Sequence, residues 1–184
     1  IGNWAVAHDV LILADDIYGR LVYNGNEFVP ISSLSEAIRK QTIVINGVSK
    51  AYAMTGWRVG YAVGNPAIIA AMSKLTGQTT SNLTAVSQYA TIEALTGPQD
   101  SVETMRQAFE ERLNTIYPLL CQVPGFEVVK PQGAFYLFPN VKKAMEMKGY
   151  TDVTEFTTAI LEEVGLALIT GAGFGAPENV RLSY

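Results

Sequence analysis

Residues 42–61 read TIVINGVSKAYAMTGWRVGY, and this stretch decides the fold of the chain. Its opening run, Thr42–Ile45, is apolar and predicts a buried strand. Lys50 follows soon after this run, and Arg58 comes eight residues later, with glycines around both. In open α/β sheets, ligands bind just beyond the carboxyl ends of the strands. The stretch therefore predicts an α/β fold with a ligand site around Lys50.

The chemistry of the lysine and the arginine indicates which class of ligand the site would bind. Partial burial lowers the pKa of an amine and frees the lone pair that a Schiff base requires. An arginine carries a permanent charge and a planar set of donors that suits phosphate. Together, Lys50 and Arg58 point to an aldehyde cofactor that carries a phosphate. Either residue taken alone is better explained as an ordinary surface side chain on a glycine-rich loop.

A second group of residues lies upstream and agrees with the first. The run Val10–Ala14 is apolar at successive positions, which is typical of a strand buried on both faces of a parallel sheet. It ends in Asp15 and Asp16, and Tyr18 stands three residues after the first acid. A carboxylate here could pair with a protonated pyridine nitrogen. The alternative is two loop acids and a tyrosine at the rim, and strand register decides which acid faces the ligand.

The segments 15–18, 46–61 and 179–184 closely resemble the fold-type-I, pyridoxal-phosphate-dependent aminotransferases of class I/II, the aspartate aminotransferase group. The resemblance covers essentially the whole chain. It implies an α/β fold in which residues 1–100 are the latter part of the large, PLP-binding domain. They would supply part of the sheet of that domain, which has a three-layer α/β/α architecture. Residues 101–184 would be a connecting helix and most of a small, truncated C-terminal α/β domain.

The resemblance implies a role for each matching residue. Lys50 would be the catalytic lysine that forms a Schiff base with pyridoxal 5'-phosphate. The cofactor's pyridine nitrogen would pair with Asp15, and its phenolic oxygen would accept a hydrogen bond from Tyr18. Ser49 and Arg58 would bind its phosphate.

Two further positions bear on the site that the resemblance implies. Arg181 matches the arginine that binds the α-carboxylate of the substrate. Several relatives carry a hydroxyl residue three positions before the lysine, where it touches the phosphate. That position is Gly47 in this chain, which departs from the pattern at this contact.

The activity implied by the resemblance is transamination between an amino acid and a 2-oxo acid, with aspartate or broad specificity, by a homodimer. A PLP-dependent β-lyase of the same fold is an alternative, because fold and cofactor do not settle the reaction. A ligand-sensing, aminotransferase-like domain of a transcription regulator is another, and a folded piece without cofactor is a third.

The chain lacks several features of the family's upstream half: a glycine-rich phosphate loop, an aromatic residue that stacks on the cofactor, and an Asn-Pro-rich segment. It also has no initiator methionine. We therefore expect a fragment, the latter half of a longer enzyme. Alone, it is expected to be inactive and to bind the cofactor weakly.

Composition excludes several other classes of function. The net charge of −4, with scattered basic residues, argues against binding to nucleic acid. His8 is the only histidine, which excludes a histidine-based metal cluster, and Cys121 has no second cysteine for a disulfide. A lone cysteine is compatible with the cytoplasm. No apolar run approaches the ~20 residues that span a bilayer.

Local signals predict the remaining elements of the chain. A second strand is predicted at 59–64, on the other side of the lysine loop. Pro66 begins a helix to about Thr76, and Ser81 or Asn82 caps another that Gly97-Pro98 ends. A long helix with an apolar stripe starts at Asp100. The last third is predicted to hold strands at 126–129, 134–138, 166–169 and 180–183, a helix from Asp152 to Gly165, and a glycine-rich loop at 170–175.

Overall fold

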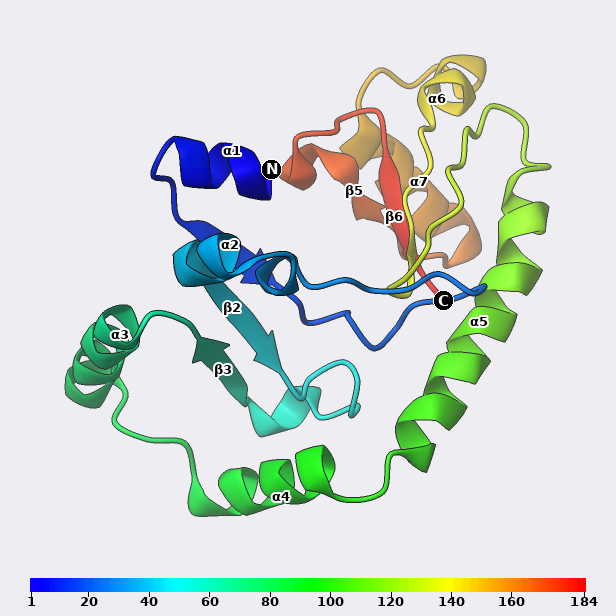
Figure 1. Cartoon of the computed structure of the whole chain (residues 1–184). Helices are drawn as coiled ribbons and strands as arrows, with labels where there is room; N and C mark the ends of the chain where they lie inside the picture. The colour runs from blue at the N-terminus through cyan, green and yellow to red at the C-terminus, as the bar shows by residue number, and fades with distance from the viewer. The chain divides into compact units, whose positions relative to one another are not determined.

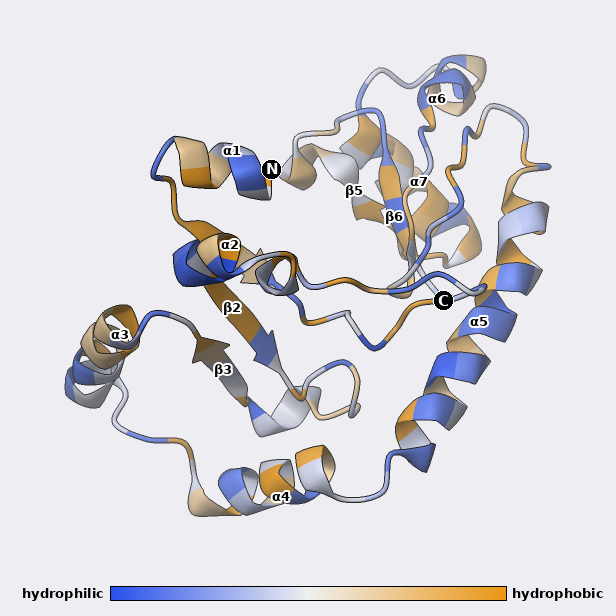
Figure 2. Ribbon diagram, viewed as in Figure 1, coloured by the Kyte–Doolittle hydropathy of each residue, from blue (hydrophilic) through white to orange (hydrophobic).

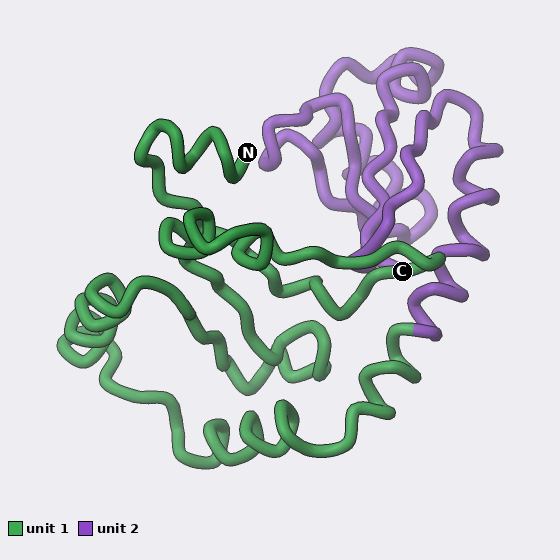
Figure 3. Tube along the Cα trace, viewed as in Figure 1, with its two compact units in different colours: residues 1–106 green, residues 107–184 purple.

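The computed structural model describes residues 1–184 as a mixed α/β chain (Figure 1). The chain divides into two compact units, residues 1–106 and residues 107–184 (Figure 3). The boundary falls inside the long helix α5 (Asp100–Leu120), which therefore contributes to both units. None of the helices is both long enough and apolar enough to cross a membrane.

A mixed sheet of three strands, in the order β1-β2-β3, forms the centre of the first unit. Strands β1 (Ile12–Asp15) and β2 (Thr42–Gly47) run parallel, as predicted, with Asp15 opposite Ile45. Strand β3 (Gly60–Val63) lies within the strand predicted at 59–64. It is antiparallel to β2, a direction that the sequence did not predict. Because β1 and β2 are parallel, their carboxyl ends meet at one edge of the sheet. Both sequence motifs follow that edge.

The expectation that β1 is buried on both faces is wrong for this chain. Its residues alternate between half-buried and exposed, and Leu13 is 70% exposed. The reason is that β1 pairs only with β2 and has an open edge on its other side. Figure 2 shows hydrophobic colour along β1 and over the first part of β2. The apolar pattern thus predicted the strand correctly but overestimated how far its two faces are buried.

Three helices of the first unit, α2, α3 and α4, begin at capping side chains. Ser35 accepts a hydrogen bond from Ile38 N at 3.2 Å, and Asn65 accepts one from Ala67 N at 2.9 Å. Such caps satisfy backbone donors that have no partner within the helix. The elements are α1 (Gly2–Ala7), η1 (Ile31–Ser33), α2 (Glu36–Gln41), η2 (Thr55–Trp57), α3 (Pro66–Thr79) and α4 (Ala85–Thr96).

Helix α4 starts later than the sequence predicted. Its N-cap is Thr84, whose hydroxyl accepts from Ser87 N at 3.2 Å, rather than Ser81 or Asn82. Ser81 has a φ of 61°, a left-handed conformation that cannot serve as an ordinary N-cap. Helix α3 also runs on to Thr79, beyond the predicted end.

The second unit has a small antiparallel sheet with the order β4-β6-β5. Its helix α7 agrees with the prediction: Asp152 accepts from two backbone amides at the start, and Gly165, with a φ of 71°, ends it. Val141, Met145, Phe156 and Val180 belong to the buried core of this unit. The elements after α5 are β4 (Tyr136–Leu137), α6 (Lys142–Lys148), α7 (Val153–Val164), β5 (Ile169–Thr170), η3 (Gly171–Phe174) and β6 (Val180–Ser183).

Three predicted strands of this unit are shorter or absent. Residues 126–129 make one isolated bridge, in which Glu127 and Asn140 exchange hydrogen bonds of 2.9 Å, instead of a strand. Pro131 follows closely and has no backbone donor to extend the pairing. The strands predicted at 134–138 and 166–169 shrink to β4 and β5, and helix α6 was not predicted.

Candidate functional site

A cavity of about 260 Å³ lies at the carboxyl ends of β1 and β2. Three residues that the sequence singled out line it together: Asp15, Ser49 and Arg58. They come from two segments far apart in the chain, which the parallel pairing of β1 and β2 brings to one edge. The other lining residues are Ile17, Ile45, Asn46, Gly47, Val59 and Gly60.

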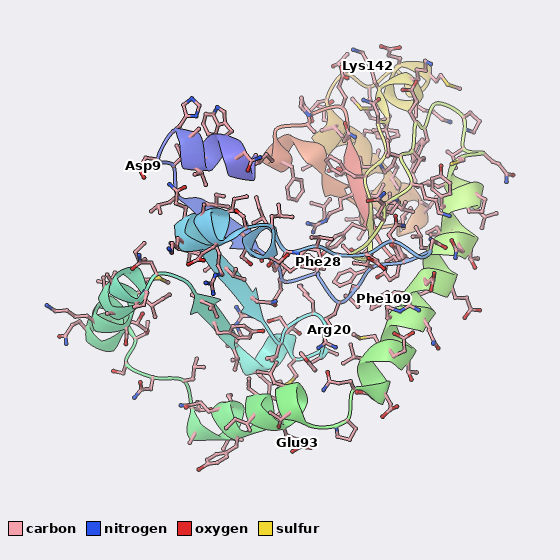
Figure 4. All side chains as sticks on the ribbon, viewed as in Figure 1. Asp9, Arg20, Phe28, Glu93, Phe109 and Lys142 are labelled. Carbon is pink, nitrogen blue, oxygen red and sulfur yellow. The ribbon has the colours of Figure 1, made fainter.

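The two adjacent acids line different cavities. Asp15 lines the 260 Å³ cavity, and its Oδ1 accepts a hydrogen bond from Ile17 N at 3.2 Å. Asp16 lines another cavity of about 480 Å³, together with Arg20 and Phe28, which are labelled in Figure 4. Successive side chains of a strand point to opposite faces, which accounts for the separation. Burial, together with the charge of Asp15, raises the pKa of Asp16 above its usual value.

Lys50 and Tyr18 lie close together. The Nζ atom of Lys50 is 5.8 Å from the centre of the Tyr18 ring, and both side chains are half-buried. An ammonium at this distance from a phenol ring is attracted to it electrostatically. The structure therefore brings together the amine and the phenol that the two sequence motifs placed in separate segments.

Arg58 has an unusual backbone conformation. It follows the short helix η2 with φ 55° and ψ 47°, in the left-handed region. Such a conformation is uncommon for a residue other than glycine and costs strain energy, although five other non-glycine residues of this chain also adopt a positive φ. Its Nη1 donates to Thr55 O at 3.0 Å, which directs the guanidinium beside the cavity.

Gly47 lies where β2 and β3 approach each other closely. A Cβ atom at this position would be 2.7 Å from Val59 O and 3.2 Å from Gly60 Cα. The side chain of Asn46 also accepts a hydrogen bond from Gly47 N at 2.7 Å. The backbone therefore leaves no room for a hydroxyl residue at position 47, and Ser49 is the hydroxyl residue that lines this cavity.

Arg181 lies on β6 of the second unit, between two aromatic rings. The centre of its guanidinium is 4.6 Å from the Tyr136 ring and 5.0 Å from the Phe174 ring. Its Nε is buried and has no hydrogen-bond partner. A buried charged donor without an acceptor is costly, so this side chain is suited to an anion that supplies the missing acceptor.

Ile17 and Asn46 also line the 260 Å³ cavity. Both lie inside the matching segments 15–18 and 46–61, but the sequence assigned a role to neither. Ile17 stands between Asp15 and Tyr18, so the spacing of those two residues could have indicated it. No residue spacing in the sequence indicates Asn46 in the same way, because its position depends on the pairing of β2 with β3, in which it lies opposite Tyr61.

Comparisons with known proteins agree on one family. The family described as aminotransferase class I and II matches residues 1–184. An asparagine–oxo-acid transaminase of Streptococcus mutans is 80% identical over 184 residues, which are 100% of this chain and 47% of that protein. An aspartate aminotransferase of Bacillus subtilis is 53% identical over the same coverage.

Solved structures show the same likeness. The aspartate aminotransferase of Rhizobium meliloti has a TM-score of 0.90 at 35% identity, and the match covers 99% of this chain and 47% of that one. An aromatic aminotransferase of Pyrococcus horikoshii has a TM-score of 0.91 at 31% identity, over 100% of this chain and 48% of that one. The chain thus spans about half the length of the relatives it matches.

Proposed function

The chain belongs to the family of class I and II aminotransferases, and from this membership we propose that its full-length protein transfers amino groups between an amino acid and a 2-oxo acid. Aminotransferases of the aspartate group depend on pyridoxal phosphate. The observation that carries the proposal is the cavity in which Asp15, Ser49 and Arg58 come together.

The donors and acceptors around this cavity fit pyridoxal phosphate. Arg58 and Ser49 offer a cation and a hydroxyl for the phosphate, and Asp15 offers a carboxylate for a protonated pyridine nitrogen. Lys50 and Tyr18 do not line this cavity, but each directly follows a residue that does, and Lys50 offers the amine with the phenol of Tyr18 close to it. When bound, the cofactor supplies an aldehyde that condenses with amines and a ring that accepts electrons.

Each residue of this chain then has a definite task. Lys50 would hold the cofactor through its aldehyde, and its amine would take the proton from the substrate's α-carbon as a general base. Asp15 would keep a proton on the pyridine nitrogen through its negative charge. Arg58 and Ser49 would hold the phosphate, and Tyr18 would donate a hydrogen bond to the phenolic oxygen. These roles follow from the resemblance and from the residues' positions.

Arg181 is proposed to bind the α-carboxylate of the substrate. A guanidinium donates two parallel hydrogen bonds to a carboxylate, which orients the bond to the α-hydrogen for proton removal. Its buried Nε without a partner and the two flanking rings support this role. The rings restrict the rotation of the guanidinium, so less entropy is lost when the carboxylate binds.

The names of the relatives guide the choice of substrate. The 80% identical relative is an asparagine–oxo-acid transaminase, whereas relatives near 55% identity are aspartate aminotransferases. We therefore propose asparagine or aspartate as the amino donor. None of these names favours a β-lyase or a ligand-sensing domain of a transcription regulator.

The experiment is a coupled assay of the full-length protein with pyridoxal phosphate, a 2-oxo acid, and either asparagine or aspartate. We expect the amino group to pass to the 2-oxo acid, with one of the two donors clearly preferred. Absence of transfer from both donors, in a protein that carries the cofactor, would contradict the proposal. Release of pyruvate from sulfur amino acids would support the β-lyase instead.

The remaining expectations stay proposals of the same kind. Residues 1–100 are proposed to belong to the large, cofactor-binding domain, and residues 101–184 to the connecting helix and the small domain. The full-length enzyme is proposed to act as a homodimer in the cytoplasm, without metal, nucleic acid or membrane as a partner.

A further inference from the structure

Tyr18 and Lys50 come from different segments, so their distance depends on what holds the two segments together. Leu21 N donates to Tyr18 O at 2.8 Å, directly after the tyrosine. Leu21 and Tyr23 are fully buried, on either side of Val22. The segment that carries Tyr18 is therefore anchored around Val22.

Helix α5 supplies a polar part of this anchor. Arg106 donates from Nη1 to Val22 O at 3.3 Å, across 84 positions of the sequence. Glu103 accepts from Arg106 Nε and from Nη2, each at 2.9 Å, which fixes the plane of the guanidinium. The bond to Val22 O is partly buried, because the Arg106 side chain is only 23% exposed, whereas the Glu103 side chain is 54% exposed and in contact with water.

The same end of α5 also reaches the segment that carries the lysine. Tyr52, two residues after Lys50, donates its hydroxyl hydrogen to Gln99 Oε1 at 3.2 Å. Gln99 lies just before α5, and its Nε2 donates to Ala94 O at 3.0 Å and to Gly97 O at 2.8 Å. These two bonds fix the orientation of the amide, so that its oxygen faces Tyr52.

The geometry points to residues 99–106, at the amino-terminal end of α5 (Figure 1), as a clamp that sets the distance between Lys50 and Tyr18. Arg106 acts through Val22, and Gln99 acts through Tyr52, so both are positioning residues rather than catalytic ones. The inference rests on the proposed function. It adds that α5, beyond connecting two parts of the chain, controls the environment of the reactive amine.

The clamp has a chemical consequence. The pKa of an amine depends on the distance of the charges and donors around it. A phenol that moves relative to Lys50 therefore changes the pH at which the lysine-bound cofactor gains or loses its proton. This proton changes the visible absorbance of the cofactor, which gives a readout independent of turnover.

The test uses the full-length holoenzyme and two variants, Arg106→Met and Tyr52→Phe. Each removes donors of one arm of the clamp and keeps most of the side-chain volume. We expect the pKa seen in the visible absorbance to shift by about 0.5 pH units or more in each. We expect kcat to fall about threefold to tenfold, the effect of one lost hydrogen bond, with a smaller change in KM. Arg39→Met, an exposed position on α2, is the matched control and should match the wild type.

Several outcomes would overturn the clamp. The clamp is overturned if both variants keep the absorbance pKa and the kcat of the wild type. It is also overturned if the variants lose thermal stability while their absorbance pKa stays unchanged. If Arg106→Met does not fold, Tyr52→Phe alone decides, because it removes a single hydroxyl. A wild-type protein that shows no cofactor absorbance and no transamination would overturn the proposed function itself, which separates the two failures.

Discussion

Replacing Gly47 by alanine tests the close approach of β2 and β3 beside the cavity. The added Cβ would lie 2.7 Å from Val59 O, 3.2 Å from Gly60 Cα and 3.3 Å from Ile17 Cδ1. The nearest of these atoms is the backbone oxygen of the residue directly before β3, and the next belongs to Gly60, which pairs with Gly47. The clash is therefore relieved only if β2 and the start of β3 move apart. The substitution therefore acts on the sheet and on the cavity at once.

The magnitude follows from two opposing effects. Overpacking of this kind costs about 1–3 kcal/mol. Replacing glycine by alanine also restricts the unfolded chain, which returns about 0.4–1 kcal/mol. We expect Gly47→Ala to lower the free energy of unfolding by a net ~1.3 kcal/mol, within limits of ~0 and ~2.6 kcal/mol. The affinity for pyridoxal phosphate should fall as well, because the residues that would bind the phosphate flank this position.

The assay is urea denaturation of the full-length protein, together with titration of the apoenzyme by pyridoxal phosphate. Gly56→Ala is the matched control, because it lies in the same segment and has nothing within 4 Å of the added Cβ. The control should unfold at the urea concentration of the wild type or slightly higher. If Gly47→Ala and Gly56→Ala have the same midpoint and cofactor affinity, the reasoning from the close approach is refuted.

Further predictions concern the two acids and the stability of single helices. Asp15→Asn should strongly slow proton abstraction in single-turnover measurements, whereas Asp16→Asn should leave it near the wild-type rate; the reverse would make Asp16 the pyridine partner. Because burial raises the pKa of Asp16, the folded protein holds this proton more tightly than the unfolded chain, whose value is near 3.8. That stabilisation is present below the unfolded pKa and is lost as the pH rises through the folded one, so Asp16→Asn should be more stable than the wild type at neutral pH but not in acid. Gly77→Ala, inside α3 with open space around it, should raise stability by roughly 1 kcal/mol in thermal unfolding, and no gain would contradict the helix there. Asp152→Ala should cost about 1 kcal/mol by removing the cap of α7, and an unchanged unfolding midpoint would show the cap to be unimportant.

The sequence predicted those features that depend on neighbouring residues. The apolar run at Thr42 predicted β2, and Asp152 and Gly165 predicted both ends of α7, because caps act within a few positions of the backbone. The antiparallel pairing of β3 with β2, and the single bridge at Glu127 in place of a strand, depend on distant partners instead, which no local pattern contains.

The same distinction applies to the site. The motifs predicted that Lys50 and Tyr18 belong to one site, because both follow strands that a parallel sheet aligns at one edge. The residues alone left the choice between Asp15 and Asp16 open, and the resemblance assigned the role to Asp15. In the structure, Asp15 is the acid that lines a cavity with Arg58. The steric exclusion at Gly47 could not be predicted, because it arises from the neighbouring strand β3.

The measurement that tests the central claim most directly is the identification of the lysine that carries the cofactor. The full-length protein, loaded with pyridoxal phosphate, would be treated with borohydride, digested, and examined by mass spectrometry. We predict a single modified peptide, labelled at Lys50, and no label in Lys50→Ala, which should also lose transamination. Labelling at another lysine, or normal turnover by Lys50→Ala, would contradict the account.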